Sequence, residues 1–280
     1  MIPQRNLSLL SNRLVRAGGR RIVEAVLERD YCLAWFLVGL SRSPLRERLL
    51  FKGGTALKRC YFADYRFSED LDFTLATPTE IDDIREGLEA VYREVERDSG
   101  IVFRYSRPDR KSHRNSHTFY LSYEGPLPSV SPKEVKVDIT IREQLVCAPE
   151  DRPVLRGYDE YEDLPEDALV RAYTLDEIGV EKLVAFTDRA RNEPRDLYDL
   201  WKLTEEHHVD FGMLVPDIDR KLAFRGRTRA TLVAHLDKKE GRYKKLWNAR
   251  LGPQMVALPP FEDVFRAVRR AMRSAGLIER

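Results

Sequence analysis

The chain has 280 residues, of which 42% are hydrophobic and 34% are charged, a composition that excludes a disordered or collagen-like protein. Its formal net charge of +2 gives by itself no indication of a nucleic-acid partner, which usually requires an excess of positive charge. The balance is uneven, however, because residues 220–280 carry 16 basic and 5 acidic side chains, whereas the preceding 219 residues carry 32 and 41. A basic C-terminal region therefore follows an acidic one.

Cysteine usage and hydropathy indicate where the protein works. The three cysteines, Cys32, Cys60 and Cys147, are widely spaced and form no C-x-x-C motif, which is typical of reduced cysteines inside cells. The longest apolar run, residues 31–40, is about half the length of a membrane span. The N-terminus lacks the pattern of a signal peptide. We therefore expect a cytoplasmic protein with no membrane partner.

Helical and extended patterns alternate in the first 150 residues. Apolar residues at helical spacing predict two helices within residues 7–40, separated at Gly18 and Gly19. A short buried strand at 49–51 then ends in a glycine turn, after which helical spacing resumes to Tyr61. The remaining elements are a strand at 71–75, a charged helix at 78–98, and strands at 101–105, 118–123 and 135–141. This order predicts a mixed β-sheet with flanking helices.

The chain changes character after residue 150. Residues 150–177 carry ten acidic and three basic side chains, which is typical of a solvated connector. We therefore expect a sheet domain at 1–150 and a helical domain at 151–280. The predicted helices of the second domain are 175–189, 194–207, 216–224, 228–251 with a break at Gly241, and 261–272. The expected fold class is α+β, a mixed sheet with flanking helices followed by a C-terminal helical bundle.

Two aspartates alternate along the strand that begins near residue 70. Asp70 and Asp72 project from one face, while the apolar residues between and after them point into the core. Two carboxylates this close repel unless a cation neutralises them, and their oxygens suit Mg²⁺. A single D-x-D is otherwise typical of an exposed strand face. The strand at 135–141 adds Asp138 on the neighbouring surface of the same sheet, which favours a metal site.

A glycine turn precedes these aspartates. Lys52, Gly53, Gly54 and Thr55 lie between a strand and a helix, where the backbone can approach a ligand and the helix N-terminus offers N–H groups to phosphate oxygens. The order of residues differs from that of a P-loop, so a Walker-type NTPase is disfavoured. A Gly-Gly-Thr turn, a D-x-D strand and then a strand with one carboxylate is the layout of a nucleotidyltransferase.

Two helical motifs add further candidates. A capping box at 174–177 predicts a helix start and places Lys182 on an apolar stripe, where its stem could simply pack while the ammonium group reaches water. In the next helix, Asp199 lies one turn from Arg195 and Asp196, an arrangement that is also typical of ion pairs on a helix face.

Together these motifs resemble the AbiEii/AbiGii nucleotidyltransferase toxin family. The resemblance is carried by residues 51–57, 66–73, 136–139, 181–183 and 195–200, with a weaker match at 258–261. It implies a Mg²⁺-dependent toxin of a toxin–antitoxin system, with two ions, an NTP substrate, an antitoxin encoded next to it and a role in phage defence. MenT-type relatives transfer NMP from an NTP to the 3′ end of tRNA with release of pyrophosphate, which blocks aminoacylation and hence translation.

The resemblance also implies roles for individual residues. Asp196 and Arg195 are expected to support the site, whereas Asp199 positions Lys182 or the substrate. The implied catalytic residues are Asp70, Asp72, Asp138, Lys182 and Asp199, and the first three of these are also the metal ligands. The implied nucleotide-binding residues are Lys52, Gly53, Gly54, Thr55, Ser68 and Lys182.

Two basic groups are candidates for RNA binding, although a basic run is also typical of a solvated face. Such groups neutralise phosphates, and interleaved aromatic residues, here Tyr243 and Trp247, could stack bases. The first group is Lys238, Lys239, Arg242, Lys244 and Lys245, which we expect to bind tRNA. The second group is Arg104, Arg107, Arg110, Lys111 and Arg114.

Two alternative functions stay open. The same aspartates could serve a nucleotidyltransferase that modifies a protein or a small molecule, which would not need the basic region. A non-catalytic binding protein of the same fold is the other alternative, and the intact set of lysines and aspartates argues against it.

Overall fold

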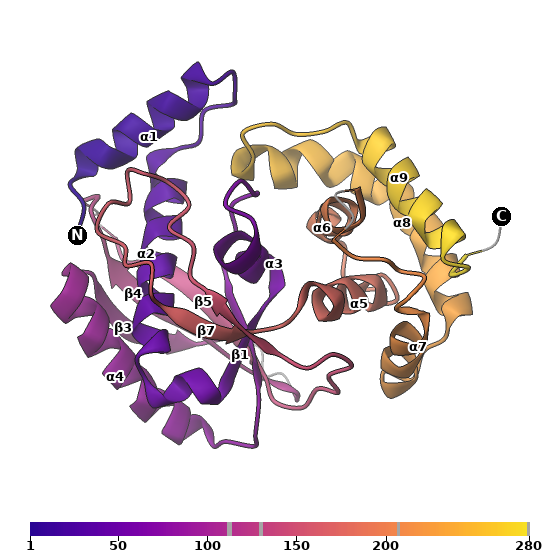
Figure 1. Cartoon of the computed structure of the whole chain (residues 1–280), viewed down its shortest axis with the longest axis horizontal. Coiled ribbons are helices and arrows are strands. Elements are labelled where there is room, and N and C mark those ends of the chain that lie inside the picture. The colour runs from indigo at the N-terminus through magenta and orange to yellow at the C-terminus, as the bar shows by residue number, and fades with distance from the viewer. Residues whose placement is uncertain (111–113, 129–130, 206–207, 279–280) are drawn as a thin grey trace. The chain divides into compact units, whose positions relative to one another are not determined.

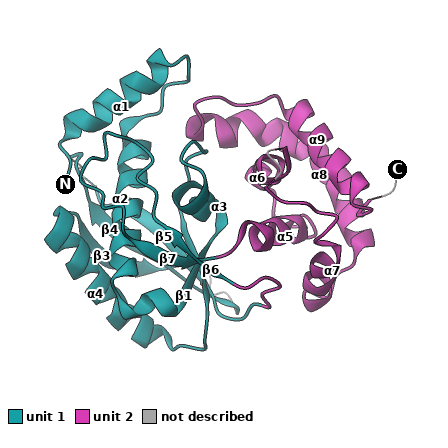
Figure 2. Ribbon diagram, in the orientation of Figure 1, with its two compact units in different colours: residues 1–143, 149–172 teal, residues 144–148, 173–280 magenta. Residues whose placement is uncertain are grey.

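The computed structural model describes residues 1–110, 114–128, 131–205 and 208–278. The chain forms two compact units, one of residues 1–143 and 149–172 and the other of residues 144–148 and 173–280 (Figure 2). We expected a domain boundary at 150/151, whereas residues 149–172 belong to unit 1. None of the described helices is long and apolar enough to cross a membrane.

The described part of unit 1 contains a mixed β-sheet (Figure 1). Its seven strands have the order β3-β4-β5-β2-β1-β7-β6. Strand β2 pairs antiparallel with β1 and parallel with β5, while β1 pairs parallel with β7. This arrangement confirms the expected α+β fold. The strands are β1 (Leu49–Lys52), β2 (Leu71–Leu75), β3 (Val102–Pro108), β4 (Ser116–Glu124), β5 (Lys133–Thr140), β6 (Glu150–Pro153) and β7 (Leu169–Ala172).

Helix α2 (Glu24–Ser41) packs on the apolar face of this sheet and against α4 (Ile81–Ser99). Phe36 contacts Phe103 of β3 in an edge-to-face arrangement, with 5.5 Å between the ring centroids. Alternate residues of the central strands, such as Phe73 and Ile139, are buried on this apolar face. The helical segments are α1 (Gln4–Arg16), α2 (Glu24–Ser41), the 3₁₀ turn η1 (Pro44–Glu47), the short α3 (Gly53–Ala56), the π-helical turn η2 (Leu57–Tyr61) and α4 (Ile81–Ser99). The two predicted N-terminal helices are therefore confirmed.

The acidic segment that we expected to be a connector instead contributes two strands. Strands β6 and β7 pair antiparallel and extend the sheet beyond β1. The pattern was misleading because β6 lies at the edge of the sheet, where charged residues and the terminal Pro153 are tolerated without loss of ladder hydrogen bonds. The acidic segment therefore includes an edge strand and is not only a connector.

Unit 2 is helical in its described part. Its helices are α5 (Leu175–Ala185), α6 (Pro194–Glu205), α7 (Val215–Phe224), α8 (Arg229–Leu251), the 3₁₀ turn η3 (Gly252–Gln254) and α9 (Phe261–Ser274). The predicted break at Gly241 is wrong, because α8 runs through this exposed glycine and buries residues on both sides of it. The predicted end of the second helix at 207 lies outside the described residues.

Candidate active site

Strand register brings three of the predicted site residues together on the polar face of the unit 1 sheet. Lys52 is the register partner of Asp72 across β1 and β2, and Asp72 is the partner of Asp138 across β2 and β5. Residues that lie opposite one another in a sheet project to the same side. The Nζ of Lys52 donates to Oγ1 of Thr140 at 3.1 Å, so the lysine side chain spans β2. Lys52, Asp72, Asp138 and Thr140 define this polar face.

Asp70 directly precedes β2, two residues before Asp72. Its backbone carbonyl accepts a hydrogen bond from Oγ1 of Thr55 at 2.5 Å, and the Thr55 side chain is buried. Ser68 is half-buried in the segment leading to this strand. The threonine hydroxyl therefore ties the glycine turn to the strand that carries the aspartates.

The glycine turn also lies directly against Asp72. Gly53 has a φ of +78°, and a Cβ at this position would lie 2.6 Å from Oδ2 of Asp72. A Cβ on Gly54 would collide with the guanidinium group of Arg66, which is buried. The site therefore requires glycine for both backbone conformation and space. Arg66 was not among the predicted site residues, although it lies in the same sequence motif as Asp70 and Asp72.

The carboxylates of this surface are the donor type that Mg²⁺ prefers. Within the described ranges, the side chains of His, Cys, Asp and Glu form no group of three arranged to hold a metal ion. Mg²⁺ is typically held by one or two protein carboxylates together with substrate phosphates, and it prefers oxygen ligands. The adjacent Asp72 and Asp138 supply this donor type, while Nζ of Lys136 lies 3.8 Å from Oδ2 of Asp138.

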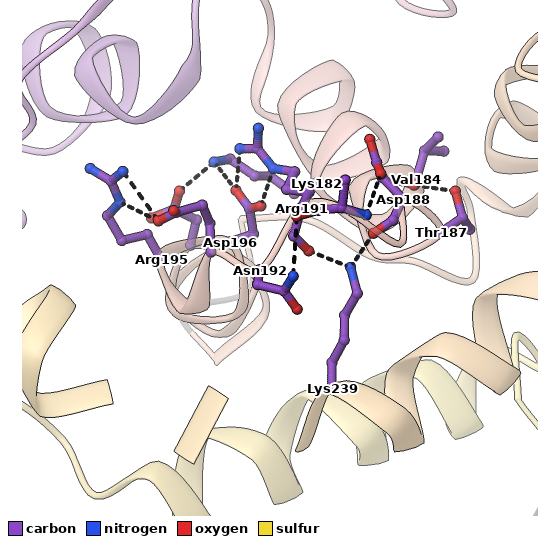
Figure 3. Close-up of polar contacts among 12 residues, drawn as sticks. Lys182, Val184, Thr187, Asp188, Arg191, Asn192, Arg195, Asp196 and Lys239 are labelled. Carbon is purple, nitrogen blue, oxygen red and sulfur yellow. Dashed lines mark hydrogen bonds and ion pairs between the residues drawn. The ribbon is translucent and has the colours of Figure 1, made fainter. Parts of the chain in front are cut away.

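A second group of predicted residues lies within unit 2. The predicted start of α5 is confirmed, since Oγ1 of Thr174 accepts from the backbone N–H of Glu177 at 3.2 Å. The Glu177 carboxylate does not close the predicted capping box but accepts from the backbone N–H groups of Val146 and Cys147. From α5, the Nζ of Lys182 reaches Asp196 of α6 (Figure 3) and a second carboxylate, that of Asp199, on the same helix. It lies 2.7 Å from Oδ1 of Asp196 and 2.7 Å from Oδ2 of Asp199. All three residues are buried.

Asp196 is as closely engaged as Asp199, which the sequence analysis ranked above it. Arg191 donates to both oxygens of Asp196, at 2.6 and 3.0 Å. Burial opposes ionisation of Asp196, but the charges of Lys182 and Arg191 outweigh it and hold the pKa of this carboxyl well below its usual value. The spacing of three residues places Asp196 and Asp199 on one helix face, which is the signal that could have shown their shared role.

Lys239 supports this cluster from α8. Its side chain is only 5% exposed, and its Nζ donates to the carbonyl oxygens of Asp188 at 2.6 Å and of Arg191 at 2.7 Å (Figure 3). Burial lowers the pKa of this lysine. The structure thus places Lys239 against the segment between α5 and α6.

The other basic residues of α8 differ from Lys239. Lys238, Arg242 and Lys245 are exposed, and the exposed Lys244 pairs with Glu262 at 2.6 Å. The expectation that Tyr243 and Trp247 stack bases is wrong. They belong to the core-facing stripe of the helix: Tyr243 contacts Phe186, and Trp247 donates to the carbonyl oxygen of Pro259 at 2.9 Å.

The basic group of unit 1 is partly neutralised. Arg104 pairs with Glu124 at 2.8 Å, and Arg107 pairs with Glu134 at 2.6 Å. Arg110 and Arg114 are exposed, while Lys111 lies outside the described residues. The cations of this group are therefore not equivalent.

Comparisons with known proteins agree with these motifs. A family model described as "Nucleotidyl transferase AbiEii toxin, Type IV TA system" matches residues 35–270. Because the match spans most of the chain, this protein belongs to the AbiEii family of nucleotidyltransferase toxins. The family implies an NTP substrate and an antitoxin partner.

A solved structure shows the same fold. MenT4, a nucleotidyltransferase toxin from Mycobacterium tuberculosis H37Rv, superimposes with a TM-score of 0.59 at 17% sequence identity, over 98% of this chain and 90% of MenT4. At this identity the similarity shows the fold alone. No match to the sequence was found among curated proteins.

Proposed function

We propose that this toxin transfers NMP from an NTP to the 3′ end of tRNA and thereby blocks translation. The observation that carries the proposal is the placement of Lys52, Asp72 and Asp138 in register on three adjacent strands of a nucleotidyltransferase family member. A lysine for phosphate charge and two carboxylates for metal binding are the groups that nucleotidyl transfer needs side by side.

In the proposed reaction, the 3′-oxygen of the RNA attacks the α-phosphorus of the NTP. A new phosphodiester bond forms, the bond between the α- and β-phosphates breaks, and pyrophosphate leaves. Asp138 accepts the proton of the hydroxyl group, and Lys52 neutralises the triphosphate. Asp70, Asp72 and Asp138 would hold two Mg²⁺ ions only together with phosphate oxygens of the substrate, and the bound ions would stabilise charge that develops in the reaction.

The remaining predicted residues keep the roles that the family resemblance implies. Lys182 binds phosphate, Asp199 positions it, and Asp196 shares that work because it lies at the same distance from Nζ. The backbone of Gly53 and Gly54 approaches the nucleotide, while Thr55 holds the turn.

The proposed RNA contact is the exposed basic surface of α8. Its residues Lys238, Arg242, Lys244 and Lys245 provide charge for the phosphate backbone, and Lys239 holds the helix against the segment before α6. Binding that depends on such contacts weakens as salt rises. The proposal places the reaction in the cytoplasm, with an antitoxin from a neighbouring gene as regulator and arrest of translation as a means of phage defence.

The test is to incubate the protein with Mg²⁺, total tRNA and each α-labelled NTP in turn, with the Asp72→Ala variant as control. We expect one or more nucleotides to label tRNA at its 3′ end, and the variant to lose this label. Label only on protein or on a small molecule, or none with any nucleotide, would contradict the proposal.

A further inference from the structure

A β-bulge changes the direction of one arginine in unit 1. Tyr105 of β3 is the register partner of Leu121, but two residues later Arg107 is the partner of Tyr120, so the register shifts between them. In a regular strand Arg107 would share the face of Tyr105, which packs on Phe119. The bulge instead turns Arg107 to the polar face, where Tyr120 lies.

The redirected arginine is fixed in a stacked position. Its Cζ lies 3.7 Å from the ring centroid of Tyr120. Its Nε and Nη2 donate to the two carboxylate oxygens of Glu134 at 3.1 and 2.6 Å, and Ser106 donates to the same carboxylate at 2.7 Å. The Tyr120 ring and the Glu134 carboxylate therefore fix the guanidinium plane, yet 43% of the Arg107 side chain stays exposed.

This stack lies near the proposed catalytic carboxylates. Thr118 is the register partner of Asp138, and Tyr120 is the partner of Lys136, which is two residues from Asp138 along β5. Two residues of a strand span about 7 Å, and adjacent strands are about 5 Å apart. The Cα of Tyr120 is therefore about 9 Å from that of Asp138, and Arg107 lies one strand further away.

The order of strands indicates which substrate meets the stack. The glycine turn proposed for the triphosphate follows β1, on one side of the aspartates of β2 and β5, and Lys52 reaches from that side across β2 to Thr140 of β5. Tyr120 and Arg107 lie on β4 and β3, on the other side of the aspartates. The attacking and leaving oxygens of phosphoryl transfer lie roughly in line, on opposite sides of the phosphorus. The acceptor is thus expected on the side of β4.

We propose that the Arg107–Tyr120 stack is the subsite for an unpaired nucleobase at the 3′ end of the acceptor RNA. The base stacks on the exposed face of the guanidinium group, which the tyrosine ring supports from behind. Unpaired RNA bases are commonly bound on aromatic rings and on arginine planes. An ordinary surface ion pair would need neither the bulge nor the ring. The inference rests on the proposed function, because it takes RNA as the acceptor.

The test separates the effect of the positive charge at Arg107 from that of the planar guanidinium group and of the Tyr120 ring beneath it. Arg107→Lys keeps the positive charge and loses the planar group, and Tyr120→Ala removes the support, while Tyr120→Phe retains the ring. The matched control is Arg97→Lys on α4, where an arginine also binds a carboxylate, that of Glu94, through two nitrogens, at 2.9 and 2.6 Å.

Two quantities are measured. One is the KM for tRNA and for the NTP in the transfer reaction. The other is the fluorescence of an RNA hairpin with 2-aminopurine at its 3′ end, which is quenched when this base stacks. We expect Arg107→Lys and Tyr120→Ala to raise the KM for tRNA about 10-fold, as for the loss of one stacked base, with the KM for NTP unchanged. Both variants should lose the quenching, whereas Tyr120→Phe and Arg97→Lys retain it.

Failure of this inference is distinguishable from failure of the proposed function. If wild type labels tRNA but Arg107→Lys keeps both the KM for tRNA and the quenching, the subsite is overturned and the proposed function stands. If wild type labels no RNA, the proposed function fails and the fluorescence of the hairpin alone tests the subsite. Quenching by wild type that Arg107→Lys abolishes supports the base subsite. Quenching that is absent, or unchanged in Arg107→Lys, overturns it.

Discussion

The polar face of unit 1 and the buried lysine cluster of unit 2 hold their charged groups by different means. On the polar face, Asp72 and Asp138 are half-buried, and backbone pairing between β2 and β5 places them side by side. In the cluster, Lys182, Asp196 and Asp199 are buried, and the ion pairs themselves bring the side chains together. A substitution on the polar face should therefore change chemistry at little cost in stability, whereas one in the cluster should change both.

The largest effect on stability is expected for Asp199→Ala. This variant leaves the buried ammonium group of Lys182 with one carboxylate less, and breaking a buried ion pair by removing one partner typically costs about 3–5 kcal/mol. The free energy of unfolding from urea titration measures the loss. The matched control is Arg191→Ala. Because the Arg191 side chain is partly exposed, its removal should lower the free energy of unfolding by only about 1–2 kcal/mol. Equal costs for the two variants would show that burial does not distinguish these contacts.

Gly53→Ala should disturb the polar face through space and backbone together. Its Cβ would lie 2.6 Å from Oδ2 of Asp72, and its φ of +78° disfavours a side chain by about 1–2 kcal/mol. Gly18→Ala is the matched control, because Gly18 has a φ of +84° and nothing within 4 Å of a Cβ. We expect both variants to lose stability and only Gly53→Ala to lose nucleotide transfer. Full transfer by Gly53→Ala would mean that Asp72 need not keep its position.

Acid should destabilise the lysine cluster. Because Lys182 and Arg191 hold the pKa of Asp196 below its ordinary value of 3.8, this ionised carboxylate stabilises the fold above that pH. The contribution is lost as pH falls below about 4, by up to about 2 kcal/mol for such a group. Urea titrations at pH 6 and pH 3 should show a larger loss for wild type than for Asp196→Asn. Equal losses of stability in wild type and Asp196→Asn would mean that groups other than Asp196 cause the acid sensitivity.

The smallest effect, and one of opposite sign, is expected for Gly241→Ala. Gly241 is an exposed position inside α8 where a Cβ would meet nothing within 4 Å, so alanine should stabilise the helix by about 0.5–1 kcal/mol. The thermal midpoint measures the gain. Gly39→Ala in α2 is the contrasting variant, because its Cβ would lie 2.6 Å from Cγ2 of Val95 and should destabilise the protein.

The sequence was sufficient to predict the polar face because strand periodicity is local. Alternation placed Asp70 and Asp72 on one face, and a second alternating strand supplied Asp138, whose neighbouring position the register confirms. The same holds for the start of α5, where the capping residues lie within one turn.

What the sequence could not predict depends on distant contacts or on exceptions to periodicity. Lys239 resembled its exposed neighbours in a basic run, and only the packing of α8 shows that it is buried against backbone carbonyls. The direction of Arg107 depends on a bulge that breaks the strand period. The sequence did not predict strand β6 because its residues are mostly charged, and an edge strand needs no continuous apolar pattern.

The central claim is that the carboxylates of the polar face serve chemistry and not folding, and Asp138→Asn tests it most directly. Transfer of α-labelled nucleotide and the free energy of unfolding are measured on the same preparation. We predict that transfer falls by about 10³-fold while the free energy of unfolding stays within about 1 kcal/mol of wild type. A variant that keeps more than a tenth of the transfer rate, or that loses transfer only in proportion to its unfolding, would contradict the account.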